Sequence, residues 1–471
     1  MIDTQALRNK LLSLALEGKL LNDFEKGNTD NELIAELKSI NPKATLQFQA
    51  KDLPFHIPDN WNWVILGDIF AHNTGKALNS SNGEGVERRY ITTSNVYWDH
   101  FDLSSVKTMF FKTEEIDKCT VTKGDLLVCE GGDIGRAAIW NFDFDICIQN
   151  HLHRLRSKLT GICVKFYYYV LMFYKNINFI SGRGIGLQGL SSKKLHNIIV
   201  PMPPKDVQTL IVEKLDSSFE ILGHIDDLQA RYAADREVLK SKLIDAAIRG
   251  KLTKQLPEDG TAEELYKQIQ EEKKTLIKEK KIKSEKALPP VTEEEKAFKI
   301  PDNWGWCHLG DIASWAAGAT PNRGEIKYYK NGDIPWLKTG DLNDGYIENV
   351  PECITELALK ETSVKLQPPG TVLIAMYGAT VGKLGITTFP LTTNQACCGG
   401  IPYRGIYNKF LFYFLMHHKT DFIKQSVGGA QPNISRTKII HTVIPLPPLA
   451  EQKRIVEKLE SLLPLCDQLG K

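Results

Sequence analysis

The chain has 471 residues, of which 42% are hydrophobic and 25% are charged, a composition typical of a globular protein and unlike that of a disordered or fibrous one. Its 59 Lys and Arg residues nearly balance its 57 Asp and Glu residues. The resulting net charge of +2 excludes a polycation that binds nucleic acid through bulk charge alone, although a local basic face remains compatible with it.

Neither a membrane span nor a secretory signal is expected. No apolar run approaches the roughly 18 residues that a membrane span needs, and Lys10, Glu17 and Lys19 interrupt the N-terminal segment. Nine scattered cysteines fit free thiols better than a disulfide framework. Only Cys397 and Cys398 are close, and adjacent cysteines are poorly spaced for a tetrahedral zinc ion. We therefore expect a cytoplasmic protein without a metal site.

The sequence is a tandem duplication. The motif Ile-Pro-Asp-Asn-Trp-x-Trp at 57–63 returns at 300–306, and both copies continue into Leu-Gly-Asp-Ile, at 66–69 and 309–312. Val-Pro-Met-Pro-Pro at 200–204 returns as Ile-Pro-Leu-Pro-Pro at 444–448, and an identical Ile-Val-Glu-Lys-Leu follows each, at 211–215 and 455–459. Because order and spacing agree, the landmarks delimit two copies of one domain.

These landmarks predict an α+β protein with two mixed α/β domains and helical segments around them. In chain order we predict an N-terminal helical segment (1–54), a first domain (55–204), a central helical spacer and linker (205–297), a second domain (298–448) and a C-terminal helix (449–471).

The two ends of the chain repeat the two ends of the central helix. Residues 7–20 resemble 239–252, and residues 451–459 resemble 207–215. Joined, the two ends would rebuild most of a second long helix. We therefore predict that the termini lie close together and that a pseudo-two-fold axis relates both domains and both long helices.

The central segment predicts one long helix. From Val207 to about Arg249 most apolar residues are separated by threes, fours or sevens, and Gly250 is a plausible stop. Such a helix would be on the order of 60–70 Å long, which favours a spacer over an ordinary core helix. A capping box of Thr261 and Glu264, matched by Thr29 and Glu32 in the first copy, then begins a second helix. Residues 262–287, dense in Glu and Lys, indicate a solvated helix or linker.

Recognisable catalytic motifs are missing. Residues 378–384 (Gly-Ala-Thr-Val-Gly-Lys-Leu) resemble a phosphate-binding loop, but one residue too few separates the glycines, and Leu384 occupies the place of the Mg²⁺-binding Ser or Thr. The aligned residues 130–136 would set carboxylates against a phosphate. A tight glycine turn between strands is the better interpretation.

Charge is distributed unevenly within each copy. Residues 55–150 sum to about −6 and 151–204 to about +8, while 298–378 sum to about −3 and 379–448 to about +6. The same half of each copy is therefore basic, and the near-neutral total results from cancellation.

Polar and basic residues in both copies are the candidate nucleic-acid contacts. Arg and Lys can bind phosphates or guanine, and Asn and Gln can bind adenine; the alternative for each residue is a solvated surface position. In the first copy the candidates are Lys76, Arg88, Arg89, Asn95, Arg136, Asn150, His151, Arg183, Gln188, Lys193 and Lys194. In the second copy they are Thr320, Asn322, Arg323, Lys338, Lys383, Asn394, Gln395, Gln431, Asn433, Arg436 and Lys438.

With these motifs the sequence resembles the specificity subunits of type I restriction-modification enzymes. The resemblance rests on the paired opening motifs (57–69 and 300–312), the paired Pro-x-Pro-Pro closings, and the second-copy motifs at 318–321, 334–336, 339–341 and 378–383. It implies two target-recognition domains that each read one half of a bipartite, asymmetric DNA site. It also implies long antiparallel helices that fix the spacing between the two halves.

The resemblance further implies the partners. Two modification (methyltransferase) subunits would dock on the helices, and restriction subunits would join them. Methyl transfer from S-adenosylmethionine and ATP- and Mg²⁺-dependent cleavage would belong to those partners, so that this chain would be non-catalytic and without a cofactor of its own.

The first copy departs from the family pattern at two places. It has Gly-Lys-Ala-Leu at 75–78 where Gly-x-Thr-Pro is common, and Asp-Val-Gln at 206–208 where the second copy has Ala-Glu-Gln at 450–452. Two alternatives to the DNA-recognition hypothesis remain open: a tandem protein-binding adaptor that does not contact DNA, and a nucleotide-dependent enzyme that uses the glycine loop.

Overall fold

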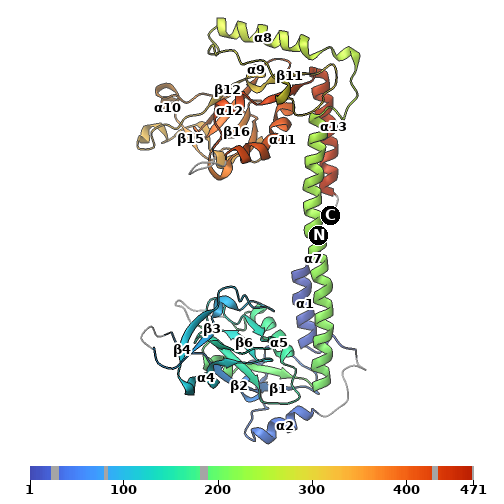
Figure 1. The fold of residues 1–471 in the computed structure, drawn as a ribbon, viewed down its shortest axis with the longest axis vertical. Coiled ribbons are helices and arrows are strands. Elements are labelled where there is room, and N and C mark those ends of the chain that lie inside the picture. The colour runs from blue at the N-terminus through green and yellow to red at the C-terminus, as the bar shows by residue number, and fades with distance from the viewer. Residues whose placement is uncertain (23–30, 79–82, 181–188, 427–432, 469–471) are drawn as a thin grey trace. The chain divides into compact units, whose positions relative to one another are not determined.

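The computed structural model describes residues 1–22, 31–78, 83–180, 189–426 and 433–468 (Figure 1). The chain forms two compact units, unit 1 (Met1–Gln229) and unit 2 (Ala230–Lys471). In the described part of the chain, no helix has the length and apolar character of a membrane span.

Unit 1 combines helices with antiparallel and mixed sheets. Its helices are α1 (Thr4–Leu16), α2 (Glu32–Ile40), α3 (Leu66–Ile69), α4 (Thr113–Cys119), α5 (Val164–Asn176), α6 (Ser192–His196) and the first part of α7 (Lys205–Ile248), with 3-10 turns η1 (Ala50–Asp52) and η2 (Thr93–Asn95). Its strands are β1 (Asn62–Ile65), β2 (Phe70–Thr74), β3 (Val86–Ile91), β4 (Lys107–Phe111), β5 (Thr120–Val121), β6 (Leu126–Cys129), β7 (Ala137–Ile139), β8 (Ile146–Ile148), β9 (Leu152–Ser157) and β10 (Ile199–Met202). The sheets have the strand orders β1-β10, β2-β9-β6-β7 and β4-β3-β8-β5.

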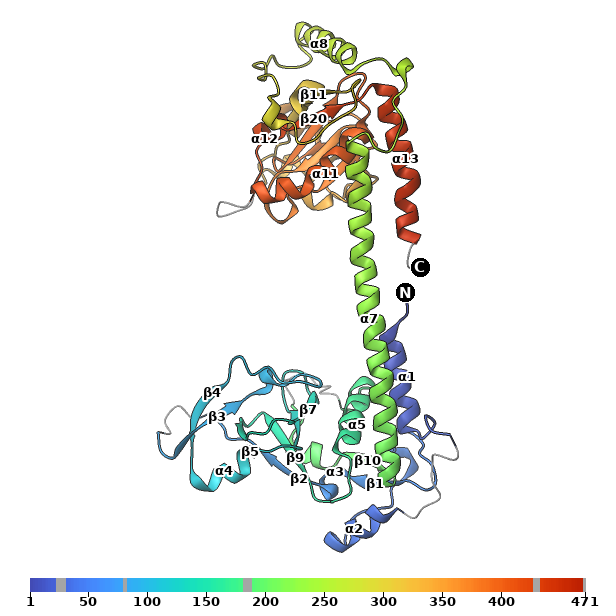
Figure 2. The ribbon, with the colours of Figure 1, turned by 45° about the vertical axis from the view of Figure 1, so that its right-hand side comes forward.

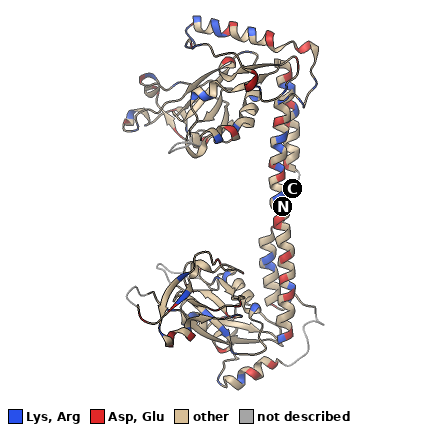
Figure 3. Ribbon diagram, in the orientation of Figure 1, with Lys and Arg blue, Asp and Glu red and all other residues tan. Residues whose placement is uncertain are grey.

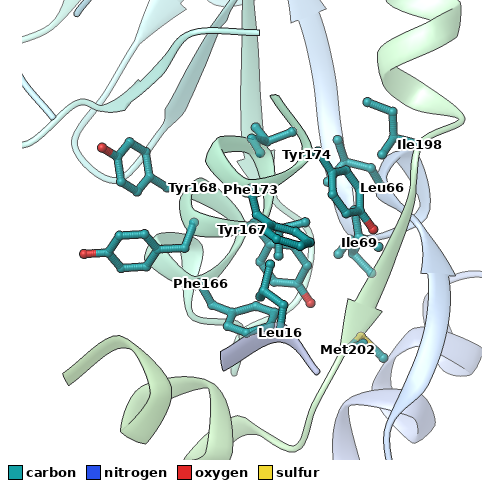
Figure 4. Close-up of a cluster of buried hydrophobic side chains, with 14 of the residues drawn as sticks. Leu16, Leu66, Ile69, Phe166, Tyr167, Tyr168, Phe173, Tyr174, Ile198 and Met202 are labelled. Carbon is teal, nitrogen blue, oxygen red and sulfur yellow. The ribbon is translucent and has the colours of Figure 1, made fainter. Parts of the chain in front are cut away.

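The main core of unit 1 surrounds α5. Its aromatic residues Phe166, Tyr167, Phe173 and Tyr174 are buried, and Figure 4 shows them beside Leu16 of α1 and residues of α3 and β10. Because α5 is covered on nearly all sides, its sequence is apolar almost throughout rather than along one stripe.

Unit 2 repeats this plan with a longer N-terminal linker. Its helices are the second part of α7, α8 (Ala262–Lys278), α9 (Leu309–Ile312), α10 (Glu356–Glu361), α11 (Asn408–Ser426), α12 (Arg436–Ile440) and α13 (Leu449–Gln468), with 3-10 turns η3 (Pro257–Asp259), η4 (Glu293–Glu295), η5 (Ile326–Tyr328), η6 (Thr339–Asp341) and η7 (Gly378–Thr380). Its strands are β11 (Gly305–His308), β12 (Ala313–Ala317), β13 (Ile334–Leu337), β14 (Gly345–Ile347), β15 (Cys353–Ile354), β16 (Val372–Ala375), β17 (Leu384–Thr387), β18 (Thr392–Thr393), β19 (Cys397–Pro402) and β20 (Val443–Leu446). The sheets have the orders β11-β20, β12-β19-β16-β17-β14 and β15-β13-β18.

Each part of α7 packs against a helix from one end of the chain. In unit 1, α1 runs antiparallel to α7, and Arg8 Nη2 lies 2.7 Å from Asp226 Oδ2 (Figure 2). In unit 2, α13 runs antiparallel to α7, and Lys240 Nζ lies 2.6 Å from Asp467 Oδ1 (Figure 2). Arg8 and Lys240 occupy the same position in the sequence repeat of 7–20 and 239–252, and each forms an ion pair with an aspartate of the neighbouring helix.

The opening motif of each copy packs against the glycine that ends a helix. Gly18 and Gly250 have left-handed backbones, with φ of +68° and +70°. A Cβ on Gly18 would lie 2.3 Å from Cγ of Pro58, and one on Gly250 would lie 2.7 Å from Cγ of Pro301. Glycine is therefore required at both positions by its backbone and by its neighbour, and the predicted stop at Gly250 is confirmed.

The closing motif of each copy is held by a buried glutamine. In unit 2, Gln452 Oε1 accepts a hydrogen bond from Tyr407 N (2.8 Å), and its Nε2 donates to Pro447 O (2.9 Å). Gln208 makes the matching bonds in unit 1, with Cys163 N (3.0 Å) and Pro203 O (2.9 Å). One glutamine per copy thus joins the proline motif, the start of the long helix and the core of the domain.

Other predictions from the sequence can be compared directly. The long helix and the Thr261–Glu264 capping box are confirmed, whereas Thr29 lies outside the described residues. Lys and Arg alternate with Asp and Glu along α7 and α8 (Figure 3). The solvated character expected of 262–287 holds only in part, because Ala262, Leu265 and Ile269 on one face of α8 are buried. The domain limits, the pseudo-two-fold axis and the proximity of the termini stay predictions.

Candidate nucleic-acid interface

Five loops of unit 1 converge at one end of its sheets. We call them loop cluster 1: residues 74–77, 92–100, 130–136, 149–151 and 189–191. They are joined by hydrogen bonds from Asn150 N to Lys76 O (2.9 Å), Glu130 N to His151 O (2.9 Å), Leu190 N to Glu130 O (2.9 Å) and Arg136 Nη2 to Thr93 O (2.7 Å). Because each loop follows a strand or precedes a helix of the core, a rigid scaffold positions the whole set.

The equivalent loops converge in unit 2. Loop cluster 2 comprises residues 318–323, 338–344, 377–383, 394–396 and 433–436. The residues directly before these loops hold them together, through hydrogen bonds from Ala319 N to Thr393 O (3.0 Å), Asn394 N to Leu337 O (2.9 Å), Met376 N to Ala396 O (2.7 Å) and Ile434 N to Met376 O (2.9 Å). The two units therefore present the same arrangement of loops with different side chains.

The glycine-rich segment belongs to loop cluster 2 as a turn between strands. It connects β16 to β17, and Gly378 and Gly382 have φ of +69° and +79°. A phosphate-binding loop leads into a helix whose N-terminus faces the phosphate, whereas this turn leads into a strand. The predicted glycine turn is confirmed.

Most candidate contacts lie in or beside the two clusters. Those within the clusters are Lys76, Asn95, Arg136, Asn150, His151, Thr320, Asn322, Arg323, Lys338, Lys383, Asn394, Gln395, Asn433 and Arg436. Arg88 and Arg89 lie on β3, Lys193 and Lys194 on α6, and Lys438 on α12. Arg183, Gln188 and Gln431 lie outside the described residues.

Two of the candidates, Lys76 and Asn95, are buried. Lys76 Nζ donates to Glu115 Oε2 (2.7 Å) and to Phe110 O (2.9 Å), and its ammonium group lowers the pKa of the Glu115 carboxyl. The side chain of Asn95 accepts a hydrogen bond from Thr92 N (2.9 Å) and donates one to Asp102 O (2.9 Å). Their polar groups are used within unit 1, so the expectation that these two side chains contact DNA disagrees with their placement.

Several cationic candidates are paired with protein groups. Arg323 and Lys338 both bind the carboxylate of Glu352, whose pKa is lowered by the hydrogen bond from Lys338 and also by that from Arg323. Arg436 Nε donates to Trp315 O (2.7 Å), and its guanidinium also binds Glu285. These residues are ordered by internal contacts before any ligand binds.

The cationic candidates Arg88, Arg89, Lys193 and Lys194 remain exposed and without a carboxylate partner among the described residues. Lys383 is half-buried and likewise unpaired within that part of the chain, whereas Lys438 Nζ donates to Gln425 O (3.1 Å). These groups can meet a phosphate without first breaking an ion pair.

Pairing across long sequence distances reduces the basic excess of each domain. Lys165 binds Asp216, Lys175 binds Asp133 and Arg156 binds Asp125. In unit 2, Lys409 binds Glu460 and Lys419 binds Asp344. Counting charges along the sequence therefore overestimates the positive surface.

Asn150 and Asn394 occupy the same repeat position, between β8 and β9 and between β18 and β19. Among the described residues, the side-chain Oδ1 of each is buried and has no hydrogen-bond partner. An unsatisfied buried carbonyl invites a hydrogen-bond donor such as water, and this feature occurs at the same position in both copies.

Two residues of loop cluster 1 were missed by the sequence reasoning. Tyr97 and His100 are exposed, and their rings are stacked 4.9 Å apart with an interplanar angle of 7°. They flank Trp98 and Asp99 in a tight turn. The sequence signal for this hairpin was apolar and polar residues that alternate on both sides of a two-residue turn. Whether two rings stack, however, depends on which strand positions face each other, and the sequence does not show this.

The comparison with known families identifies the class. The sequence matches the type I restriction modification DNA specificity domain twice, over residues 58–225 and 301–470. The two matches include most of the chain, and the chain therefore belongs to this family.

Individual relatives agree with this assignment. The type I restriction enzyme EcoEI specificity subunit of Escherichia coli is 23% identical over an alignment of 560 positions, which covers 98% of this chain and 89% of that protein. A chain from a structure on complex assembly and conformational transition of the type I R-M system has a TM-score of 0.64 at 18% identity, covering 88% of this chain and 93% of that chain. The HsdS subunit from Thermoanaerobacter tengcongensis has a TM-score of 0.53 at 18% identity, covering 89% and 93%. At such identity these two structures share the fold.

Proposed function

We propose that this chain is the sequence-specific DNA-recognition subunit of a type I restriction-modification complex. Each unit reads one half of a bipartite, asymmetric site, and the helices set the spacing between the halves. The observation that carries this proposal is the repeated loop cluster: two units hold the same five loops with different side chains. Two such clusters suit two different half-sites, and the family to which the chain belongs is a DNA specificity domain.

Within each unit we assign phosphate and base contacts by exposure and pairing. The exposed, unpaired cations Lys193 and Lys194 of α6 bind phosphates, because they offer charge without a fixed geometry. His151 and the hydrogen-bonded pair Thr320–Gln395 lie exposed within the clusters and offer donors and acceptors to base edges. Gln188, Gln431 and Asn433 stay candidates for base contacts on sequence grounds.

The paired helices bind two copies of a modification subunit. Within unit 1, Ile221 and Leu228 of α7 are each 61% exposed and lie one heptad apart, on one face of the helix. Within unit 2, Tyr232 and Leu239 of α7 are exposed at the same spacing. An exposed apolar pair on the part of α7 that belongs to each unit suits one partner docked on each unit. Restriction subunits join through those partners.

The chain itself performs no chemical step in this proposal. Methyl transfer from S-adenosylmethionine and ATP- and Mg²⁺-dependent cleavage belong to the partner subunits, and the complex acts on double-stranded DNA in the cytoplasm. The chain contributes positioning: it selects the site and holds the partners in register with it.

Methylation mapping tests the function. Modified adenines would be mapped across the genome of a host with the intact gene and with the gene deleted. We expect a single bipartite motif to lose methylation on deletion and to regain it when the gene returns. An unchanged methylation pattern, together with a complex whose affinity for DNA does not depend on salt, would instead favour the protein-binding adaptor.

A further inference from the structure

A short hairpin projects from loop cluster 1. Val96 pairs with Phe101 in an antiparallel bridge, and Tyr97 N donates to His100 O (2.9 Å). Between them Trp98 and Asp99 form the turn, and Asp99 adopts a left-handed backbone with φ of 67°. The base of the hairpin is closed by Asp102 N, which donates to Asn95 O (2.9 Å).

The tip of the hairpin is fixed to the core of unit 1. The Trp98 ring lies edge-on to Tyr168 of α5, with centroids 5.7 Å apart, and Tyr168 is buried. Asn95 Nδ2 also donates to Asp102 O (2.9 Å). A hairpin anchored at its tip and at its base cannot readily fold away, so the side chains on its other face are held in place.

Those side chains form an ordered, exposed stack. Tyr97 is 39% exposed, His100 is exposed, and their rings are nearly parallel. The Arg136 guanidinium carbon lies 5.0 Å from the centroid of Tyr97 and is held by the hydrogen bond from Arg136 to Thr93 O. Among the described residues, no ring or cation other than Tyr97 is stacked on His100. The stack therefore ends, among the described rings and cations, at the exposed side chain of His100.

An aromatic face held open beside cationic loops suits a nucleobase. Bases stack on aromatic side chains with little dependence on sequence, and side chains that insert beside a base step open it and kink the duplex. We propose that Tyr97 and His100 form a stacking wedge, an inference that rests on the proposed function. When unit 1 binds its half-site, one base leaves the stack of the DNA duplex and packs against the exposed face of His100. The wedge selects base steps that open easily.

Unit 2 does not repeat this device. After η6, the equivalent segment runs through Asn343 and Asp344 directly into β14. Its exposed aromatic residue Tyr346 lies 5.6 Å from the ammonium group of Lys409, and in the described chain no second ring stacks on it. The wedge is therefore expected at one half-site only, which gives the experiment an internal comparison.

The test uses 2-aminopurine, whose fluorescence rises when it is unstacked. The full chain assembled with its modification subunits would bind duplexes that carry the mapped site, with 2-aminopurine replacing, one at a time, each adenine of either strand other than the methylated adenines. A 2-aminopurine next to the displaced base loses that base as a stacking neighbour. We therefore expect a fluorescence increase at one step of one half-site, lost in Tyr97→Ala and His100→Ala and retained in His100→Phe. The alanine variants should also bind the site roughly tenfold more weakly.

A mismatch supplies a second readout. A mismatched pair at the responsive step is already open, so it should strengthen binding of the unmodified complex by roughly three- to tenfold and leave the alanine variants unaffected. Lys123→Ala, an exposed change at a residue paired with Asp143, is the matched control and should behave as the unmodified chain. Specific binding with the same fluorescence and mismatch response in all variants would overturn the wedge alone. Loss of specific binding by the unmodified complex would overturn the proposed function and the wedge with it.

Discussion

At the scale of single residues, the two copies have the same tryptophan in the opening motif but differ in its hydrogen bonding. Trp304 Nε1 donates to the buried carboxylate of Glu451 (2.9 Å), which also accepts from Gln255 (2.9 Å). In unit 1 the place of Glu451 is taken by Val207, and Trp61 Nε1 has no hydrogen-bond partner among the described residues. The tryptophan is therefore retained for packing against the helix end, while its hydrogen bond is specific to unit 2.

A histidine pair in unit 1 predicts a pH dependence of stability. His153 Nε2 lies 2.7 Å from Leu190 O and must donate, so its Nδ1 accepts from His72 Nε2 at 3.0 Å. Burial, with a smaller contribution from the neighbouring His153 and His196, lowers the pKa of His72 to about 4. The unfolded chain takes up this proton near pH 6.5, whereas the folded chain does so only near pH 4. This contribution to stability is therefore present above about pH 6.5 and is lost as the pH falls towards 4.

Substitution His72→Phe should flatten this dependence. Between pH 7 and pH 4.5 the unmodified chain should lose more unfolding free energy than the variant, by on the order of 1–2 kcal/mol for a partly exposed site. Urea unfolding at a series of pH values measures it. His56→Phe, which changes an exposed histidine, should keep the original slope. If the unfolding free energy of His72→Phe and of the unmodified chain fell equally with pH, the histidine pair would not be the source of the dependence.

The exposed lysines of α6 predict a salt effect. Replacing Lys193 and Lys194 together by Ala should weaken DNA binding at all sequences and reduce the dependence of log K on log salt by about 2, as expected for two lost phosphate contacts. Changes at Gln188, Gln431 or Asn433 should instead relax the base requirement at one position. Filter binding at several salt concentrations separates the two effects. If both groups of variants behave alike, the division between phosphate and base contacts is wrong.

At the scale of secondary-structure elements, the sequence predicts what is periodic or repeated and misses what depends on contacts. The long helix was predictable because an apolar stripe ends at a glycine that the opening motif then covers. The basic surface was overestimated because Lys165 and Lys175 find their carboxylates on distant elements. The hairpin at 96–101 was missed for the same reason: a stacked pair requires knowledge of which strands face each other.

The buried glutamine that joins the closing motif of unit 2 to its core predicts a loss of stability on substitution. Gln452 is fully buried, and Gln452→Leu would leave Tyr407 N–H and Pro447 C=O without partners. We expect a loss of about 2–6 kcal/mol, from roughly 1–3 kcal/mol for each of the two unpaired groups. Calorimetry of the full chain should show a lower melting temperature for the transition of unit 2. Gln268→Leu on the exposed face of α8 is the matched control. Equal melting temperatures of the two variants would contradict a stabilising role for the buried Gln452.

At the scale of the whole molecule, the near-neutral charge results from cancellation within each copy of the duplicated domain. Each unit balances exposed cations against internal ion pairs and acidic segments, so the net charge of +2 conceals local basic positions. Repeating one domain provides two recognition surfaces from a single fold, and divergence of the loops supplies different side chains for each. In the proposed function, the helix that connects the copies sets the spacing between the two half-sites.

This role predicts the outcome of lengthening α7. A seven-residue helical insertion after Ala233, where most neighbouring side chains are exposed, adds about 10.5 Å while nearly preserving the helical phase. We expect methylation mapping to show a gap longer by about three base pairs, at 3.4 Å each, with both half-sites unchanged. The same insertion between Lys283 and Ser284 in the linker should leave the gap as it was. An altered half-site, or a constant gap after the α7 insertion, would contradict the helix as the element that sets the spacing.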